Sequence, residues 1–232
     1  MKVNLISYSQ LPREDVCGNT WTSDATPQDL VAYCARVSNP GNQMNTQTAE
    51  KLIRYLARHK HWSPFEMVSV CLEIETTRDI ARQMLRHRSF SFQEFSQRYA
   101  DPTQDLAFET REARLQDPKN RQNSTATDDE GLKQIWNSMQ KNVIDQCEVA
   151  YRWAIDNGIA KEQARAVLPE GLTRSRLYVN GTLRSWIHYI ELRSANGTQQ
   201  EHIQLAKTCA QVISDLFPMI DEYVGQDIVQ DK

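Results

Sequence analysis

The stretch VSVCLEIETTRDIARQMLRHRSFSFQEFSQRY, residues 68–99, passes from one hydrophobic periodicity to another. In its first part apolar side chains alternate with polar ones, which predicts a half-buried strand over residues 68–74. Thr76 and Thr77 follow as candidate caps, and beyond them apolar residues recur at helical spacing. Residues 78–87 therefore predict a short helix whose C-terminal end is basic.

The last part of the stretch is a basic and aromatic loop. Arginines at every fourth position of the helix lead into a segment in which aromatic residues alternate with hydroxyls and amides. Aromatic side chains anchored in the core would aim the polar residues together, with Glu94 orienting the cations, and arginine forks suit a phosphate. From the residues alone, we rank a site for a phosphorylated small molecule first, a solvated basic face second and RNA binding last.

Composition sets the limits for the whole chain. Its 232 residues are 40% hydrophobic and 25% charged, and the net charge of −3 argues against a general attraction to nucleic acid. Five scattered cysteines without a C-x-x-C pair fit a reducing compartment, and we find no signal-peptide pattern and no apolar run long enough to span a membrane. We expect one cytoplasmic domain over residues 1–232.

The other segments are mostly helical. Residues 2–8 predict an edge strand, and a polar, turn-rich surface excursion, a candidate lid, occupies about 101–130. A long helix over about 132–157 is expected to bury one apolar stripe, namely Ile135, Trp136, Met139, Val143, Cys147, Ala150 and Ile155. We also expect a strand at 175–181 and helices at 48–59, 160–169, 182–193 and 198–217. The fold class is α+β, a single helix-rich domain with a small central antiparallel sheet.

Several familiar sites are excluded by their motifs. The sequence contains no G-x-G-x-x-G after a strand, no G-x-x-x-x-G-K-[ST], no G-x-S-x-G and no H-E-x-x-H. A bound nucleotide or flavin would therefore not use either familiar phosphate loop. His59, His61 and Glu66 lack the ligand spacing of a metal site, so we expect no metal.

A resemblance sharpens this interpretation. RHRSFSFQEFSQR, residues 86–98, matches R-H-R, seven residues, S-x-R, and resembles the signature of flavin-dependent thymidylate synthases. HWSPFE upstream, ARAVLP in the second half and LYVNGTLRSWIHYIELRSANGTQQEH near the end also resemble that family. The resemblance covers nearly the whole chain apart from about residues 101–130. The sequence departs from the family pattern at Met67 and Gly197, where many relatives have histidine.

The resemblance implies two sets of ligand-binding residues. Those expected at flavin adenine dinucleotide (FAD) are His61, Ser63, Arg86, His87, Arg88, Glu94, Asn180, Arg184 and His188. Those expected at deoxyuridine monophosphate (dUMP) are Gln83, Arg86, Glu94, Ser96, Arg98, Arg165 and Arg193. It also implies a homotetramer with active sites shared between chains.

The implied reaction is the reductive methylation of dUMP to dTMP. No cysteine of the sequence has a neighbouring base or metal partner that would activate it as a nucleophile. Reduced FAD would supply hydride, NADPH would reduce the flavin, and methylenetetrahydrofolate would supply the carbon. We expect Arg193 to be the catalytic residue, because a fixed cation beside the uracil imide favours its anion. The alternatives are a basic-aromatic RNA-binding module and a non-catalytic flavoprotein.

Overall fold

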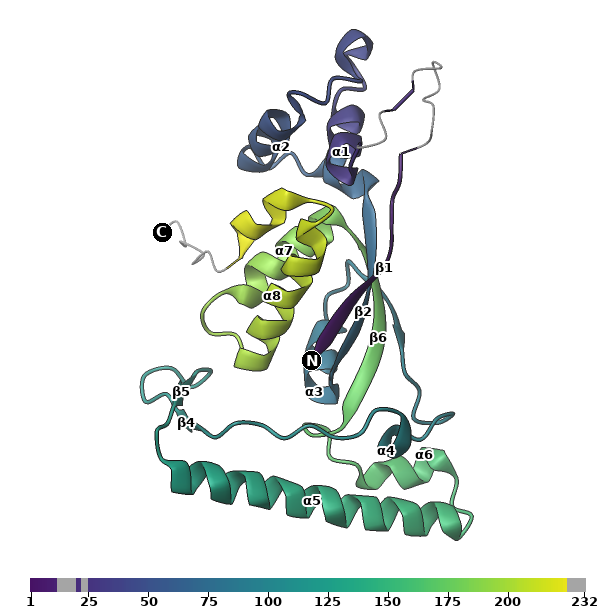
Figure 1. Ribbon diagram of the computed structural model, residues 1–232, viewed down its shortest axis with the longest axis vertical. Helices are drawn as coiled ribbons and strands as arrows, with labels where there is room; N and C mark the ends of the chain where they lie inside the picture. Colours follow the sequence, from purple (N-terminus) through teal and green to yellow (C-terminus); the bar gives the residue numbers. More distant parts are fainter. Residues whose placement is uncertain (12–19, 22–24, 225–232) are drawn as a thin grey trace.

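Four antiparallel strands from distant parts of the chain form the central sheet (Figure 1). The computed structural model describes residues 1–11, 20–21 and 25–224. Strand β1 (Lys2–Tyr8) pairs with β2 (Ser69–Thr77), β2 pairs with β6 (Arg174–Thr182), and β6 pairs with β3 (Ser91–Glu94). The α+β prediction is confirmed, as are the three strands expected at residues 2–8, 68–74 and 175–181. The fourth, β3, forms within the segment that we expected to be a loop.

The two faces of the sheet follow the alternation of β2. Val70, Leu72 and Ile74 are fully buried, whereas the intervening residues lie on the polar face. On that polar face, Glu75 accepts hydrogen bonds from Arg176 at 2.6 Å and from Arg174 at 3.1 Å. The opposite face of β2, which carries Val70, Leu72 and Ile74, is apolar and forms part of the hydrophobic core.

Two helices, α7 (Leu183–Ser194) and α8 (Gln200–Ser214), lie side by side against that apolar face (Figure 1). Trp186 of α7 is fully buried, and its indole N–H donates to the carbonyl oxygen of Val70 at 3.0 Å. Thr182 caps α7 through its side chain, which accepts from the backbone N–H of Ser185. The core thus fixes both the position and the rotation of α7, which carries three of the predicted site residues.

The N-terminal helices α1 (Pro27–Ala35) and α2 (Ala49–Arg58) lie together at one end of the sheet (Figure 1). Helix α2 was predicted. Helix α1 was not, although Thr26 and Asp29 form a capping box at its N-terminal end. The short 3₁₀ segments η1 (Pro40–Asn42), η2 (Ser63–Met67) and η4 (Pro218–Tyr223) complete this end and the C-terminal edge of the core.

The polar excursion contains more regular structure than its sequence predicted. It holds a short helix, α4 (Pro102–Asp105), and a hairpin of β4 (Arg114–Gln116) and β5 (Ser124–Ala126). Ser, Asn and Asp side chains compete with regular structure locally, so a composition of this kind hides short elements. The hairpin is tied back to the core by Arg114, which pairs with Glu201 of α8.

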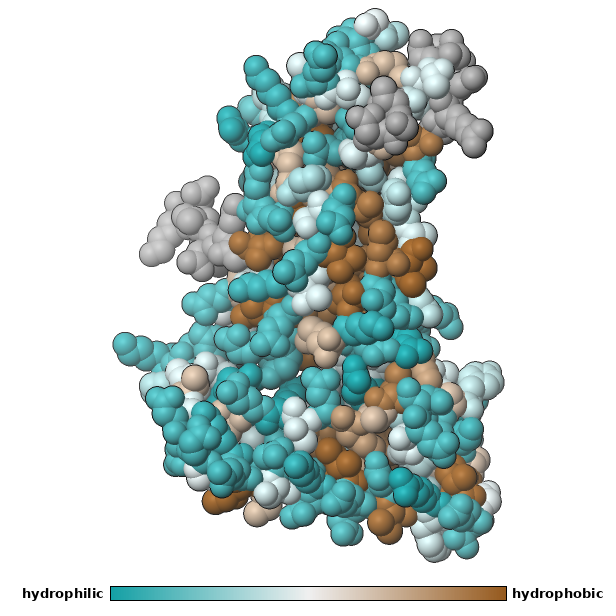
Figure 2. Space-filling view, viewed as in Figure 1, coloured by the Kyte–Doolittle hydropathy of each residue, from teal (hydrophilic) through white to brown (hydrophobic). Residues whose placement is uncertain are grey.

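Helix α5 (Glu130–Asp156) lies along the edge of the molecule, away from the sheet (Figure 1). The predicted helix exists, but its predicted burial is wrong for four of seven residues: Ile135, Trp136, Met139 and Val143 are 59%, 44%, 56% and 49% exposed. Hydrophobic side chains emerge along this edge in Figure 2. The periodicity predicted an apolar face correctly, and the error was to expect that the rest of this chain covers it.

The far end of α5 is covered by the chain itself. Its buried Tyr151 and Ala154 pack with Ala164 of α6 (Lys161–Ala164), which continues into η3 (Arg165–Val167). Gly158 has φ +75°, so it adopts the left-handed conformation expected of the residue that ends a helix. In the described residues, no helix is long and apolar enough to cross a membrane.

Candidate functional site

The basic and aromatic loop is fixed to the edge of the sheet by its aromatic side chains. Helix α3 (Arg78–Met84) leads into the loop, and β3 then pairs with β6, with Ser91 opposite Asn180. Phe90 is buried and its ring centroid lies 4.6 Å from that of Trp186. The predicted anchoring is confirmed for Phe90, whereas Tyr99 is 83% exposed and anchors nothing.

Gly181 makes this close approach possible. A Cβ atom at position 181 would lie 2.2 Å from Cδ1 of Phe90, a distance that no side chain tolerates. The ring therefore sits on the backbone of β6, and the polar residues on either side of Phe90 are turned away from the core.

A hydrogen bond joins the loop to the C-terminal end of α7. The Nε atom of Arg193 donates to Nε2 of His87 at 2.9 Å. Since a guanidinium can only donate, Nε2 of His87 is unprotonated and the ring is the neutral tautomer with its proton on Nδ1. Burial, with a further contribution from Arg193, lowers the pKa of His87 to about 4. The two residues thus form a cation held by a neutral acceptor.

Arg193 is itself partly desolvated. Burial lowers the pKa of Arg193, and the neighbouring cation of Arg86 lowers it further. Arginine stays charged despite such shifts, so its charge lies in an environment that would strengthen its attraction to an anionic ligand. Arg86 and Arg88 are exposed on the loop beside it.

Glu94 does not lie free among the cations of the loop. It accepts a hydrogen bond from Oγ of Ser175 at 2.9 Å and one from Nη1 of Arg78 at 3.4 Å. Arg78, rather than an arginine of the R-H-R motif, is therefore its cationic partner. Both bonds end on Oε1, which holds the carboxylate half-buried at the sheet edge.

A second group of predicted residues gathers at Glu162 of α6. Its carboxylate pairs with Arg98 at 3.5 Å, and its carbonyl oxygen accepts from Nε of Arg165 at 3.3 Å. Ser96 lies in the same turn as Arg98 and accepts a hydrogen bond from its backbone N–H. Arg98 and Arg165 thus both contact Glu162, and their exposed guanidinium groups, with the hydroxyl of Ser96, are donors of the kind that bind a phosphate.

A third group lies at the N-terminal half of α7. The ring centroid of His188 lies 4.8 Å from that of Trp62, and Arg184 pairs with Glu66. Burial lowers the pKa of His188, with Arg184 adding to the effect. His61 and Ser63 flank Trp62 in the sequence and are exposed. The predicted FAD residues of this region therefore lie close to one another.

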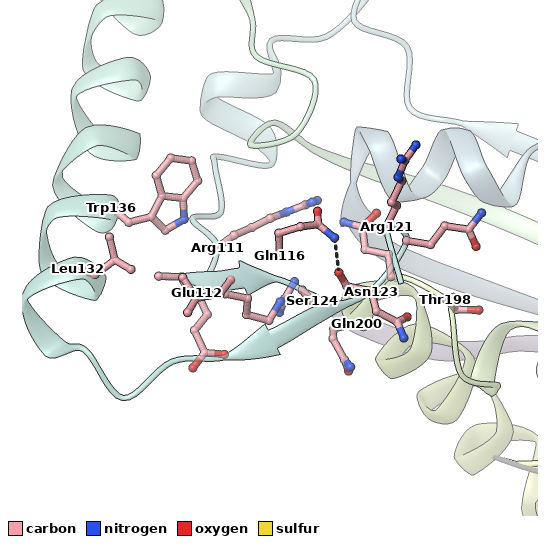
Figure 3. A pocket seen from close by; sticks show the side chains of 15 residues that line it. Arg111, Glu112, Gln116, Arg121, Asn123, Ser124, Leu132, Trp136, Thr198 and Gln200 are labelled. Atoms are coloured by element: carbon pink, nitrogen blue, oxygen red, sulfur yellow. Dashed lines mark hydrogen bonds between the residues drawn. The ribbon is translucent and has the colours of Figure 1, made fainter. Parts of the chain in front are cut away.

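The structure has one cavity beside the third group and another beside the β4–β5 hairpin. One of about 630 Å³ is lined by Trp62 and His188 and by residues of α2 and η4. Another, of about 600 Å³, lies between the β4–β5 hairpin, the start of α5 and the start of α8 (Figure 3). Trp136 and Leu132 face the hairpin from α5, and Gln116 donates to the carbonyl oxygen of Asn123 at 3.1 Å.

Sequence reasoning missed a buried polar cluster behind Gln83. His202 is fully buried, and its ring nitrogens lie 3.1 Å from Oε1 of Gln83 and from the hydroxyl of Tyr189. Gln83 also donates to Gln199 at 2.9 Å. The available signal was the position of His202, which lies on the apolar face of its helix, three and seven residues before Leu205 and Cys209.

The described cysteines do not offer a nucleophile. Burial raises the pKa of Cys147 to about 11 and raises the pKa of Cys34, Cys71 and Cys209. A raised pKa disfavours the thiolate that would attack a substrate. Cys17 lies outside the described residues. Within the described part of the chain, no group of three or more His, Cys, Asp or Glu side chains is placed to hold a metal ion.

The fold and these groups define an α+β protein with a basic and aromatic loop fixed at the edge of its four-stranded sheet. Residues 21–219 match the family model described as thymidylate synthase complementing protein, Thy1. The chain belongs to this Thy1 family, as the sequence motif predicted.

Named relatives agree with this assignment. A probable flavin-dependent thymidylate synthase of Paramecium bursaria Chlorella virus 1 is 51% identical over 84% of this chain and 89% of its own length. A flavin-dependent thymidylate synthase of Synechocystis sp. is 48% identical over 84% of this chain and 88% of its own length. The crystal structure of a UMP/dUMP methylase, PolB from Streptomyces cacaoi, bound with 5-Br UMP, is similar with a TM-score of 0.76. It is 26% identical, and the similarity covers 96% of this chain and 92% of that one.

Proposed function

We propose that this chain is a flavin-dependent thymidylate synthase that methylates dUMP to dTMP without a cysteine nucleophile. The observation that carries the proposal is the pair of Arg193 and neutral His87 next to the R-H-R loop, in a chain of the Thy1 family. The PolB structure, which holds a brominated UMP, supports a pyrimidine nucleotide as the ligand class.

In this proposal, different side chains bind different parts of dUMP. Arg98 and Arg165, with Ser96, bind the phosphate and sugar, because two guanidinium forks and a hydroxyl match the acceptors of a phosphate. Gln83 and Arg86 also hold the nucleotide, mainly through its phosphate and sugar, Arg193 meets the uracil ring, and Glu94 accepts from a ligand hydroxyl or amide. Arg193 favours the anion of the uracil imide, because its charge is partly desolvated and fixed by His87.

FAD would be held mainly by the third group and the loop. The cavity beside Trp62 and His188 provides an aromatic wall, and Arg184 provides a cation for the pyrophosphate. The other residues expected there are His61, Ser63, Arg86, His87, Arg88, Glu94 and Asn180. When bound, FAD reduced by NADPH supplies the hydride, and methylenetetrahydrofolate supplies the carbon.

The protein would assemble as a homotetramer with shared active sites. Helix α5 exposes an apolar face, and the three groups of site residues are built on different elements of the chain. Arg184 and Arg193, for example, are nine residues apart on α7, which corresponds to about 14 Å of helix rise. A neighbouring chain laid along α5 would cover the apolar face and complete the groups. A cytoplasmic location stays a prediction.

The two alternatives have less support. An RNA-binding loop would offer a row of aromatic faces to bases, but Phe90 is buried against Trp186 and Phe92 and Phe95 are half-buried, so that Tyr99 alone of these four aromatic residues is exposed. A flavoprotein without turnover would not require the desolvated cation at Arg193.

An absorbance spectrum of the purified protein, followed by titration with FAD and gel filtration, tests the cofactor. We expect a yellow protein that retains one flavin per chain. A protein that stays colourless at saturating FAD would contradict the proposal.

A further inference from the structure

The buried cluster behind Gln83 is a continuous row of hydrogen bonds. Starting from α7, the hydroxyl of Tyr189 bonds to Nε2 of His202, and Nδ1 of His202 bonds to Oε1 of Gln83, each at 3.1 Å. The amide nitrogen of Gln83 donates to Oε1 of Gln199, and that of Gln199 donates to Oε2 of Glu201, each at 2.9 Å. Three helices, α3, α7 and α8, are joined by this row.

One end of the row fixes the direction of every bond in it. Glu201 pairs with Arg114, and although burial raises its pKa, the hydrogen bonds from Arg114 and Gln199 bring it below the ordinary value. An ionised carboxylate can only accept, so the amide nitrogen of Gln199 faces it and its carbonyl faces Gln83. The amide of Gln83 must then turn its nitrogen to Gln199 and its carbonyl to His202.

The same reasoning selects one tautomer of His202. A carbonyl oxygen can only accept, so Nδ1 of His202 carries the proton, and Nε2 accepts from the hydroxyl of Tyr189. Burial raises the pKa of Tyr189 well above its ordinary value, so the hydroxyl remains a donor. Burial, assisted by Arg193 and His87, lowers the pKa of His202 to about 3, so the ring stays neutral at physiological pH.

We infer that His202 is a positioning residue that holds the amide of Gln83 in a single orientation toward the nucleotide. With one N–H committed to Gln199 and one carbonyl lone pair committed to His202, Gln83 presents its second N–H and second lone pair to a ligand. This inference rests on the proposed function, in which Gln83 meets dUMP. It also connects the nucleotide site to Arg114 of the hairpin through Gln199 and Glu201.

The tautomer can be measured without any ligand. In a ¹⁵N–¹H correlation spectrum of the uniformly labelled protein, we expect the signals assigned by their loss in His202→Asn to show a protonated Nδ1 and an unprotonated Nε2. They should not change between pH 5 and 8. A protonated Nε2, or a ring that titrates in this interval, would overturn the direction of the row.

The positioning role is tested by the dissociation constant of dUMP. His202→Phe removes both hydrogen bonds and should raise the constant about tenfold, whereas His202→Asn, whose amide nitrogen replaces Nδ1, should stay within about threefold of the wild type. Leu205→Ala, on the same helix and fully buried, is the control for lost stability alone. It should lower the melting temperature and leave the dUMP constant within about threefold.

The outcomes separate the inference from the function on which it rests. Wild-type protein that binds dUMP while His202→Phe binds it equally well would contradict the positioning role alone. Equal weakening by His202→Phe, His202→Asn and Leu205→Ala would show a purely structural histidine and would also overturn it. Wild-type protein that binds no dUMP would contradict the proposed function itself. If His202→Phe does not fold, a ring protonated at Nε2 in the ligand-free spectrum, or a His202→Asn constant raised by as much as about tenfold, would still overturn the inference.

Discussion

Nε of Arg193 lies 2.9 Å from Nε2 of His87, so the cation at the end of α7 is fixed by a residue of the R-H-R motif. The two residues are 106 positions apart in the sequence. Their contact joins the loop at the sheet edge to the core helix, and in our proposal it aims a partly desolvated charge at the uracil ring.

Replacement of Arg193 by lysine should affect the chemical step. Lysine keeps the charge but loses the planar fork and the Nε–H that meets His87. We expect the methyl-transfer half-reaction of pre-reduced, dUMP-saturated enzyme to slow by more than about tenfold, a barrier increase above ~1.4 kcal/mol. Flavin reduction by NADPH is the internal control and should change far less. A normal saturated rate with weaker binding only would contradict the catalytic role.

Replacement of Arg165 by alanine should affect binding instead. Its guanidinium lies with that of Arg98 at Glu162, and a group that grips a phosphate contributes similarly to the ground state and the transition state. We expect a raised dissociation constant for dUMP, measured by equilibrium dialysis, and a preserved single-turnover rate at saturation. Arg152→Ala, an exposed arginine of α5, is the matched control and should change neither. A slower saturated rate in Arg165→Ala would place this residue in the chemistry.

The stability of the protein should fall as the pH decreases. His202 has a pKa near 6.5 when unfolded and about 3 when folded, because burial disfavours its charged form. The unfolded chain therefore binds more protons between these values, and this contribution to stability, complete above pH 6.5, is lost as the pH falls through that window. His202→Phe should reduce the slope of unfolding free energy against pH by up to about 1.4 kcal/mol per pH unit.

Urea unfolding at pH 6.5 and pH 5 measures this slope. A His202→Phe protein with the same pH dependence as the wild type would show that His202 is not held neutral. His87, whose pKa is lowered to about 4, contributes in the same direction and is present in both proteins.

A charge on the apolar face of α5 should disrupt the assembly. Met139 is 56% exposed on the same face as Trp136 and Ile135. Met139→Glu would bury an unpaired carboxylate in the proposed interface, which is costly, so we expect smaller species by analytical ultracentrifugation and loss of activity on dilution. Gln134→Glu, which introduces the same charge on the opposite face of the helix, should remain a tetramer. Identical sedimentation of both variants would contradict an interface on α5.

Periodicity predicted most of the fold from local signals. The alternation of residues 68–74 and the helical spacing of residues 182–193 both correspond to elements whose core faces are buried within this chain. The exposed face of α5 could not be predicted, because periodicity reveals that a face is apolar but not whether its partner lies in the same chain.

The site was predicted less completely than the fold. The motif around Arg86 indicated where the cations would gather, since it is local in the sequence. The row from Tyr189 through His202 to Gln83 joins three helices and depends on distances that no local pattern encodes. Likewise, Glu94 was expected to orient the cations of the R-H-R loop, whereas in the structure it bonds to Arg78 of α3 and Ser175 of β6, contacts between segments that are distant in the sequence.

A single-turnover reaction tests the central claim most directly. Protein saturated with FAD is reduced anaerobically, supplied with dUMP, and mixed with methylenetetrahydrofolate while flavin absorbance and dTMP are followed together. The proposed function predicts one dTMP formed for each flavin reoxidised, with the cysteines blocked or intact. Flavin that stays reduced without dTMP, or dTMP formed without flavin reoxidation, would contradict it.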